Sequence, residues 1–257
     1  MINIVTLFIW FVLYSFLGWV WETSFCSIKA GHFINRGFLN GPVIPVYGFG
    51  AVFVLIALSV AAPVLPSHLP YIDIPLVFLS GMIICTILEY VTAVILESAF
   101  HIRWWDYSKQ KFNFQGRICL KSALFFGLMS VVIIYIVQPL VSGVTVSIPA
   151  DIANPLALIF LILFAVDLSV TLSSLLRLKK HLAEIQHHLE NAAEEFREDV
   201  DEFRDEVFFA LEKQKRQIQR LVKAFPDSVS KRYQGAWQKI KEHRGSYSVC
   251  WCLQGYR

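Results

Sequence analysis

Charged side chains are scarce in this sequence. Of its 257 residues, 17% are Asp, Glu, Lys or Arg and 56% are hydrophobic, and the mean hydropathy is +0.54. Soluble globular domains contain about 25% charged residues. The composition therefore excludes an ordinary soluble domain and indicates a membrane protein.

Several motifs of enzyme chemistry are also missing. There is no GxxxxGK[ST] phosphate loop, so we expect that this chain does not hydrolyse ATP. Its five cysteines include no CxxC pair and no Cys/His ligand spacing, which predicts buried thiols without a disulfide framework, a metal or another cofactor. No nucleophile or nucleic-acid-binding motif is present. We therefore predict no catalytic residues and no nucleic-acid partner, and we favour a protein that is not an enzyme.

What the chain does have is long apolar runs, each near the ~20 residues that a helix needs to cross a bilayer. The five runs cover residues 4–28, 48–65, 74–97, 120–140 and 155–176. The first is not expected to be a cleaved signal peptide, because it lacks a basic start and contains Glu22. The pattern predicts an all-α, polytopic membrane bundle of about five transmembrane helices, which forms a domain over residues 1–177.

Basic residues between these runs predict the orientation. The first connection holds Lys29 and Arg36 and the third, over residues 101–121, holds five Lys or Arg, whereas 66–73 and 141–153 hold none. Lys and Arg collect on the cytoplasmic side of membrane proteins. We therefore expect an outside N-terminus and a cytoplasmic C-terminal region over residues 178–257.

An irregular segment follows the first run. Residues 35–51, NRGFLNGPVIPVYGFGA, contain four glycines and two prolines, which disfavour a regular helix, yet most of the other residues are apolar. Irregular backbone at membrane depth is tolerated only where protein or a water-filled cavity surrounds it. We expect residues 35–50 to form a re-entrant or broken segment that lines a cavity on the cytoplasmic side.

Acidic residues inside the apolar runs predict a polar site, because a carboxylate at membrane depth normally faces a bundle interior or a wet cavity. One interpretation is structural, with each acid paired to a nearby arginine. The other is a cavity, open to the cytoplasm, that binds a substrate or a lipid head group. The candidate residues are Glu22, Arg36, Glu89, Glu97, Arg103, Asp106, Asn113, Arg117 and Asp167.

The second basic connection contains an aromatic cluster. Trp104, Trp105 and Tyr107 are typical of an interfacial aromatic belt, so we predict that they anchor the chain at the membrane surface. The polar residues Asp106, Asn113 and Arg117 in the same connection can hold a head group or cap the cavity, and this alternative stays open.

The C-terminal region has a helical pattern. Apolar residues recur about every 3.6 residues from Leu178 to Phe225, which predicts one straight amphipathic helix of ~70 Å. Its polar face is acidic over residues 194–206 and basic over residues 213–244. We favour a homo-oligomer formed through the apolar stripe. The alternative is a docking arm whose basic end binds anionic membrane lipids or an acidic partner.

Several blocks of the sequence resemble a known family. They are YSFLGWVWET (14–23), RGFLNGPVIPVYGFGA (36–51), LEYVTAVILE (88–97), RWWDYS (103–108) and FNFQGRICL (112–120). In this order they are similar to the signature blocks of the bacterial ABC-transporter type IV family, over residues ~1–180. The resemblance implies a multi-pass protein of the bacterial cytoplasmic membrane with a permease-like role, and it supplies no catalytic residues.

Three functions follow as expectations. The first is a permease or transport-associated subunit with a polar, cytoplasm-facing cavity and a separate ATPase subunit as partner. The second is a non-catalytic scaffold or sensor that signals through its cytoplasmic helix. The third and least favoured is an intramembrane enzyme acting on lipids, with Glu89 or Asp167 as general acid or base.

Overall fold

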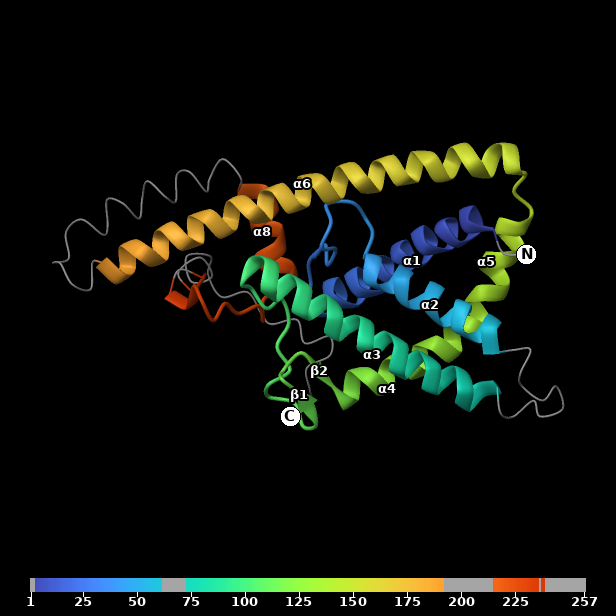
Figure 1. The fold of residues 1–257 in the computed structure, drawn as a ribbon, viewed down its shortest axis with the longest axis horizontal. Coiled ribbons are helices and arrows are strands. Elements are labelled where there is room, and N and C mark those ends of the chain that lie inside the picture. The colour runs from blue at the N-terminus through green and yellow to red at the C-terminus, as the bar shows by residue number, and fades with distance from the viewer. Residues whose placement is uncertain (1–2, 62–72, 192–214, 236, 239–257) are drawn as a thin grey trace.

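The computed structural model describes residues 3–61, 73–191, 215–235 and 237–238, and helices dominate it (Figure 1). The helices in chain order are α1 (Ile4–Ala30), α2 (Pro45–Ala61), α3 (Asp73–Phe100), α4 (Leu120–Val132), the π-helical turn η1 (Ile133–Val137), α5 (Gln138–Val146), α6 (Ala150–Asn191) and α8 (Lys215–Ala224). A short antiparallel hairpin of β1 (Asn113–Phe114) and β2 (Ile118–Cys119) joins α3 to α4.

The membrane class predicted from the apolar runs is confirmed. Four helical stretches are long and apolar enough to cross a bilayer, namely Ile4–Ala30, Ile74–Phe100, Leu120–Val146 and Ala150–Glu184. The apolar helix α2 is shorter, and the described part of it ends at Ala61. Large apolar side chains such as Leu158, Ile162 and Val166 of α6 are more than half exposed, as expected for surfaces that face lipid.

Small residues bring the helices together in pairs. A Cβ atom at Gly48 of α2 would collide with Ser15 and with the Phe11 carbonyl of α1, and one at Gly81 of α3 would collide with Ser130 of α4. Helices in membranes pack closely where such residues remove side-chain bulk. The backbones of α1 and α2, and of α3 and α4, therefore approach each other at these glycines.

The third long span is interrupted, because η1 adds an extra residue to one turn and Pro139 follows it at the start of α5. This bend carries α5 back toward α1. There the Trp10 indole N–H donates to Thr145 Oγ1 at 2.8 Å, and Tyr14 hydrogen-bonds Gln138. These two contacts join α5 to α1.

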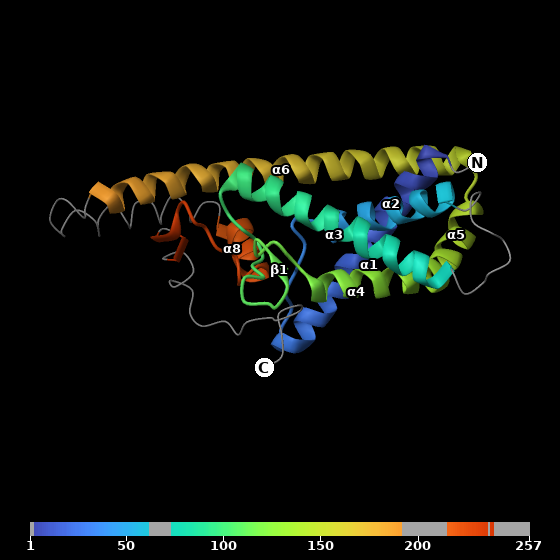
Figure 2. The same cartoon turned by 60° about the horizontal axis from the view of Figure 1, so that its bottom comes forward.

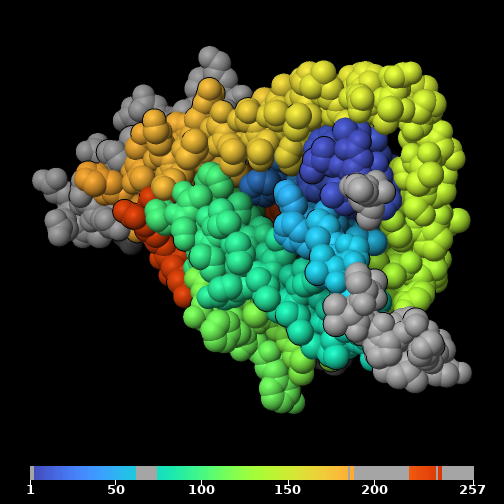
Figure 3. Space-filling view, turned by 45° about the vertical axis from the view of Figure 1, so that its right-hand side comes forward, coloured from blue at the N-terminus to red at the C-terminus, as the bar shows by residue number. Residues whose placement is uncertain are grey.

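Helix α6 crosses the bundle and continues well beyond the ends of the other helices (Figures 1 and 2). Phe164 of α6 packs edge-on against Phe11 of α1, with ring centroids 5.6 Å apart. The space-filling view shows the surface hollowed between α6, α2 and α3 (Figure 3).

The predicted straight helix over residues 178–225 is corrected by the structure. Leu221 of α8 belongs to the same buried cluster as Leu178 and Leu182 of α6, although a straight helix would separate residues 178 and 221 by ~65 Å. Helix α8 therefore packs back on the base of the bundle (Figure 1). The acidic stretch 194–206 lies outside the described residues. Leu178, Leu182 and Leu221 of the predicted apolar stripe are buried, but the period could not reveal that the chain reverses.

Candidate functional site

The connection between α1 and α2 has no regular secondary structure and is held by side chains from distant elements. Helix α1 ends at Ala30 and is capped by Gly31, whose φ of +70° suits glycine. From α6, the Asp167 carboxylate accepts hydrogen bonds from the Asn40 backbone amide at 2.9 Å, the Asn40 side chain at 2.9 Å and the Gly41 amide at 2.7 Å. The carboxylate thus satisfies backbone donors that an irregular segment would otherwise leave unpaired.

The carbonyl groups of the same connection are held by α8. Arg220 donates to the Gly37 carbonyl at 2.6 Å, to the Phe38 carbonyl at 2.9 Å and to the Leu39 carbonyl. Burial lowers the pKa of the Arg220 guanidinium, and the nearby charge of Asp167 acts in the opposite direction. In residues 37–41, Arg220 therefore binds backbone carbonyl groups and Asp167 binds backbone amides.

Arg36 joins this connection to α1. Its guanidinium lies 3.9 Å from the Glu22 carboxylate, and both side chains are less than one-fifth exposed. The same guanidinium stacks 5.0 Å above the Phe225 ring. The Tyr47 side chain of α2 also hydrogen-bonds Glu22. Arg36 and Glu22 thus lie close together, as expected. Arg36 also contacts Phe225, the residue directly after α8.

Glu89 occupies a different environment, although it lies on α3 only eight residues before Glu97. It is 8% exposed and accepts hydrogen bonds from the Tyr107 hydroxyl at 3.0 Å and from Ser122 Oγ at 3.3 Å. Burial, and secondarily the Glu89 carboxylate, raises the pKa of Tyr107, so this hydroxyl remains a donor. Among the residues that the structure describes, no Lys, Arg or His forms an ion pair with Glu89.

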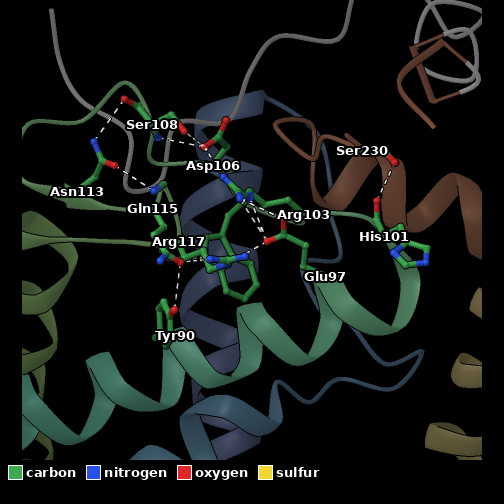
Figure 4. A network of polar contacts seen from close by, with 12 residues as sticks. Tyr90, Glu97, His101, Arg103, Asp106, Ser108, Asn113, Gln115, Arg117 and Ser230 are labelled. Atoms are coloured by element: carbon green, nitrogen blue, oxygen red, sulfur yellow. Dashed lines mark hydrogen bonds and ion pairs between the residues drawn. The ribbon is translucent and has the colours of Figure 1, made fainter. Parts of the chain in front are cut away.

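Glu97, by contrast, is surrounded by arginines (Figure 4). Arg103 reaches both of its carboxylate oxygens, at 3.1 and 3.3 Å, and Arg117 Nε lies 2.9 Å from Oε2. Arg103 also approaches Asp106 at 3.5 Å and is 7% exposed. The arginines neutralise this acid, so this part of the site has the geometry of a structural ion-pair network.

The remaining candidate residue shapes the hairpin. Asn113 Oδ1 accepts from the Gly116 amide at 3.0 Å, and its amide nitrogen donates to the Gln110 carbonyl at 2.7 Å. Gly116 has a φ of +68°, and a Cβ there would lie within 2.9 Å of Asp106 and Arg103 atoms. Asn113 therefore supports the turn that places Arg117 next to Glu97.

The predicted aromatic anchor is wrong for two of its three members. Trp104 and Tyr107 are each 3% exposed and pack inside the protein, and Trp105 is half-buried, with its indole N–H donating to the Arg117 carbonyl at 3.0 Å. The exposed aromatic residues of this connection are Phe112 and Phe114. Sequence alone could not separate these roles, because both sets of rings lie in one basic loop.

The cysteine expectation is also corrected in part. Cys85 and Cys119 are free thiols, but Cys26 is disulfide-bonded. Within the described part of the chain, no group of three or more potential ligands has the arrangement of a metal site.

The nine predicted site residues thus fall into separate groups. Glu22 lies with Arg36, and Glu97 lies with Arg103, Asp106 and Arg117. Asp167 holds the irregular connection, Glu89 lies between hydroxyl groups, and Asn113 supports the hairpin turn. Sequence reasoning missed Asn40, Ser122 and Arg220, whose roles depend on contacts between residues 33 to 183 positions apart.

Together, the fold and these groups define a multi-pass helical membrane protein with charged and polar groups concentrated toward one end of its bundle. The chain matches the family described as "Putative ABC-transporter type IV" over residues 9–172, more than half of its length. It belongs to this family, and is a membrane protein of a transport-related family. No curated protein and no solved structure matches it.

Proposed function

We propose that this protein is a permease or transport-associated subunit whose polar site, centred on Glu89, binds a substrate or lipid head group. The observation that carries the proposal is the environment of Glu89. This carboxylate is buried between two hydroxyl donors, without an ion-pair partner in the described part of the chain. A buried acid that no basic group neutralises favours a cationic ligand or a proton.

The basic residue of the proposed site would be Arg36, which, like Glu89, lies near Tyr47. Its ion pair with Glu22 is long, at 3.9 Å, and its Nε atom is buried with no hydrogen-bond partner among the residues that the structure describes. A phosphate or carboxylate group of a ligand would satisfy this donor. We therefore assign the recognition of an anionic group to Arg36 and of a cationic group to Glu89.

The orientation and partners form part of the same proposal. The Lys and Arg residues of the two basic connections favour a cytoplasmic position, at a bacterial inner membrane, for the hairpin, α8 and the end of α6. The chain has no phosphate loop of its own, so a separate ATPase subunit would bind at this surface. Homo-oligomer formation stays part of the proposal, although Leu178, Leu182 and Leu221 of the predicted apolar stripe are buried within the chain itself.

Native mass spectrometry of the protein released from lipid nanodiscs tests this function. We expect the wild type to retain a ligand that Glu89→Gln and Arg36→Ala both lose. Glu184→Gln is the matched control, since Glu184 is an exposed carboxylate on α6. Retention of the same species by all three variants would contradict the proposal, as would the absence of any bound species in the wild type.

A second function is favoured by one specific contact. Because Arg220 of α8 binds the carbonyl groups of residues 37–39, a change in the irregular connection reaches the C-terminal region directly. A sensor or scaffold that signals through this region would use that contact. Arg220→Gln would then abolish the biological response while leaving ligand retention at Glu89 unchanged, whereas a permease would lose transport through Glu89→Gln.

A further inference from the structure

The tip of the hairpin, residues 109–114, exposes an unusual combination of side chains. Phe112 is 81% exposed and Phe114 is 56% exposed, and Lys109 and Lys111 beside them are exposed as well. Neither lysine forms an ion pair with a described residue. Two aromatic rings and two exposed ammonium groups therefore share one small surface.

Two contacts place this tip at the boundary of the membrane. The candidate span Leu120–Val146 begins at Leu120, and the Leu120 amide donates to the Phe112 carbonyl at 3.1 Å. The Phe114 ring lies 5.8 Å from the ring of Tyr90, which is ten residues, or ~15 Å, before the end of α3. The hairpin thus folds back along α3 toward the bilayer.

The exposed conformation is built into the hairpin. Phe112 has a φ of +53° and Gln115 a φ of +54°, a region that residues of this kind rarely adopt. The hydrogen bonds that Asn113 makes to Gln110 and Gly116 hold the turn against this strain. The tip therefore presents Phe112 in a fixed place.

We propose that the hairpin tip binds anionic phospholipids at the membrane surface from which α3 and α4 emerge. The ammonium groups of Lys109 and Lys111 contact lipid phosphates, and the rings of Phe112 and Phe114 insert at the level of the upper acyl chains. Lysines near an anionic surface and aromatic rings at the interface have these preferences. The proposal uses no residue of the Glu89 site and stands apart from the proposed function.

The first test measures lipid selectivity in the full-length protein. Nanodiscs containing equal phosphatidylglycerol and phosphatidylcholine are analysed by native mass spectrometry at low ionic strength. We expect Lys109→Gln and Lys111→Gln each to lower the retention of phosphatidylglycerol relative to phosphatidylcholine by about fivefold. Lys231→Gln is the matched control, because Lys231 is an exposed lysine elsewhere on the same side of the bundle.

A second test measures the depth of the rings. Phe112→Trp adds one tryptophan to the seven native ones, and lipids brominated on the acyl chain should quench the added emission. Lys231→Trp should not be quenched. The proposal is overturned if the lysine variants retain phosphatidylglycerol as the wild type does, if the control loses it equally, or if Phe112→Trp is quenched no more than Lys231→Trp. The first of these results would direct attention to an acidic protein partner.

Discussion

Glu89 and Glu97 lie two turns apart on α3, and their surroundings differ in kind. Two arginines bind Glu97 and two hydroxyl groups bind Glu89, although Glu89 is the more deeply buried. A carboxylate that is paired with arginines contributes to structure, and removing it leaves those cations uncompensated. A carboxylate with only neutral donors contributes little net stability and remains available to a ligand.

The comparison predicts the largest effect for Glu97→Gln. This substitution leaves the buried Arg103 and the half-buried Arg117 without their shared anion, so we expect a loss of about 2–4 kcal/mol in the free energy of unfolding. Thermal unfolding in nanodiscs measures it. A variant as stable as the wild type would show that the network is only a surface contact.

Removing the Asp167 carboxylate should have the next largest effect. Asp167→Ala leaves the amides of Asn40 and Gly41 unpaired, at an expected loss of about 2 kcal/mol. Hydrogen exchange should increase across residues 37–44. Asp151→Ala is the control, because Asp151 is an exposed acid near the start of α6. Unchanged exchange in Asp167→Ala would contradict the proposed role of Asp167.

The contact between α8 and the irregular connection should be weaker. Arg220→Gln removes a charged donor shared by the carbonyls of residues 37–39, for an expected loss of about 1.5 kcal/mol. Exchange should rise both in these residues and in α8. Arg177→Gln is the matched control, because Arg177 is exposed. An equal rise of amide hydrogen exchange in both variants would indicate a general effect of charge and would contradict a specific role for Arg220.

Glu89→Gln completes the comparison with a smaller expected change. Glutamine keeps an oxygen that can accept from Tyr107 or Ser122, and no cation loses a partner, so we expect less than about 1 kcal/mol. The melting temperature should therefore stay near that of the wild type. A loss as large as that of Glu97→Gln would remove the distinction between the two acids.

The parts of this molecule that sequence predicts well are those that depend on local pattern. Continuous apolar residues gave the membrane helices, and Gly and Pro indicated the irregular segment before α2. That segment was predicted to extend to residue 50, but residues 45–50 are helical and belong to α2. The pairing of Arg36 with Glu22 could be predicted from the sequence, because both residues lie near the same end of α1. The contact of Arg220 with residue 38 spans 182 positions, and no local signal predicts it.

The smallest predicted effect is a pH dependence at the C-terminal contact. Desolvation, with the nearby charges of Lys179 and Arg232, lowers the pKa of His101, whose carbonyl accepts from Ser230 Oγ at 2.7 Å. The folded state favours the neutral His101 ring. The stability that this ring contributes is therefore fully present above the ordinary histidine pKa of about 6.5, and it is lost as the pH falls through the lowered pKa of the folded protein. The wild type should therefore lose melting temperature between pH 7.5 and 5 relative to His101→Asn, which tolerates the φ of +56° at this position. Parallel curves for the two proteins would show that His101 does not sense pH and that any acid sensitivity of the contact arises elsewhere.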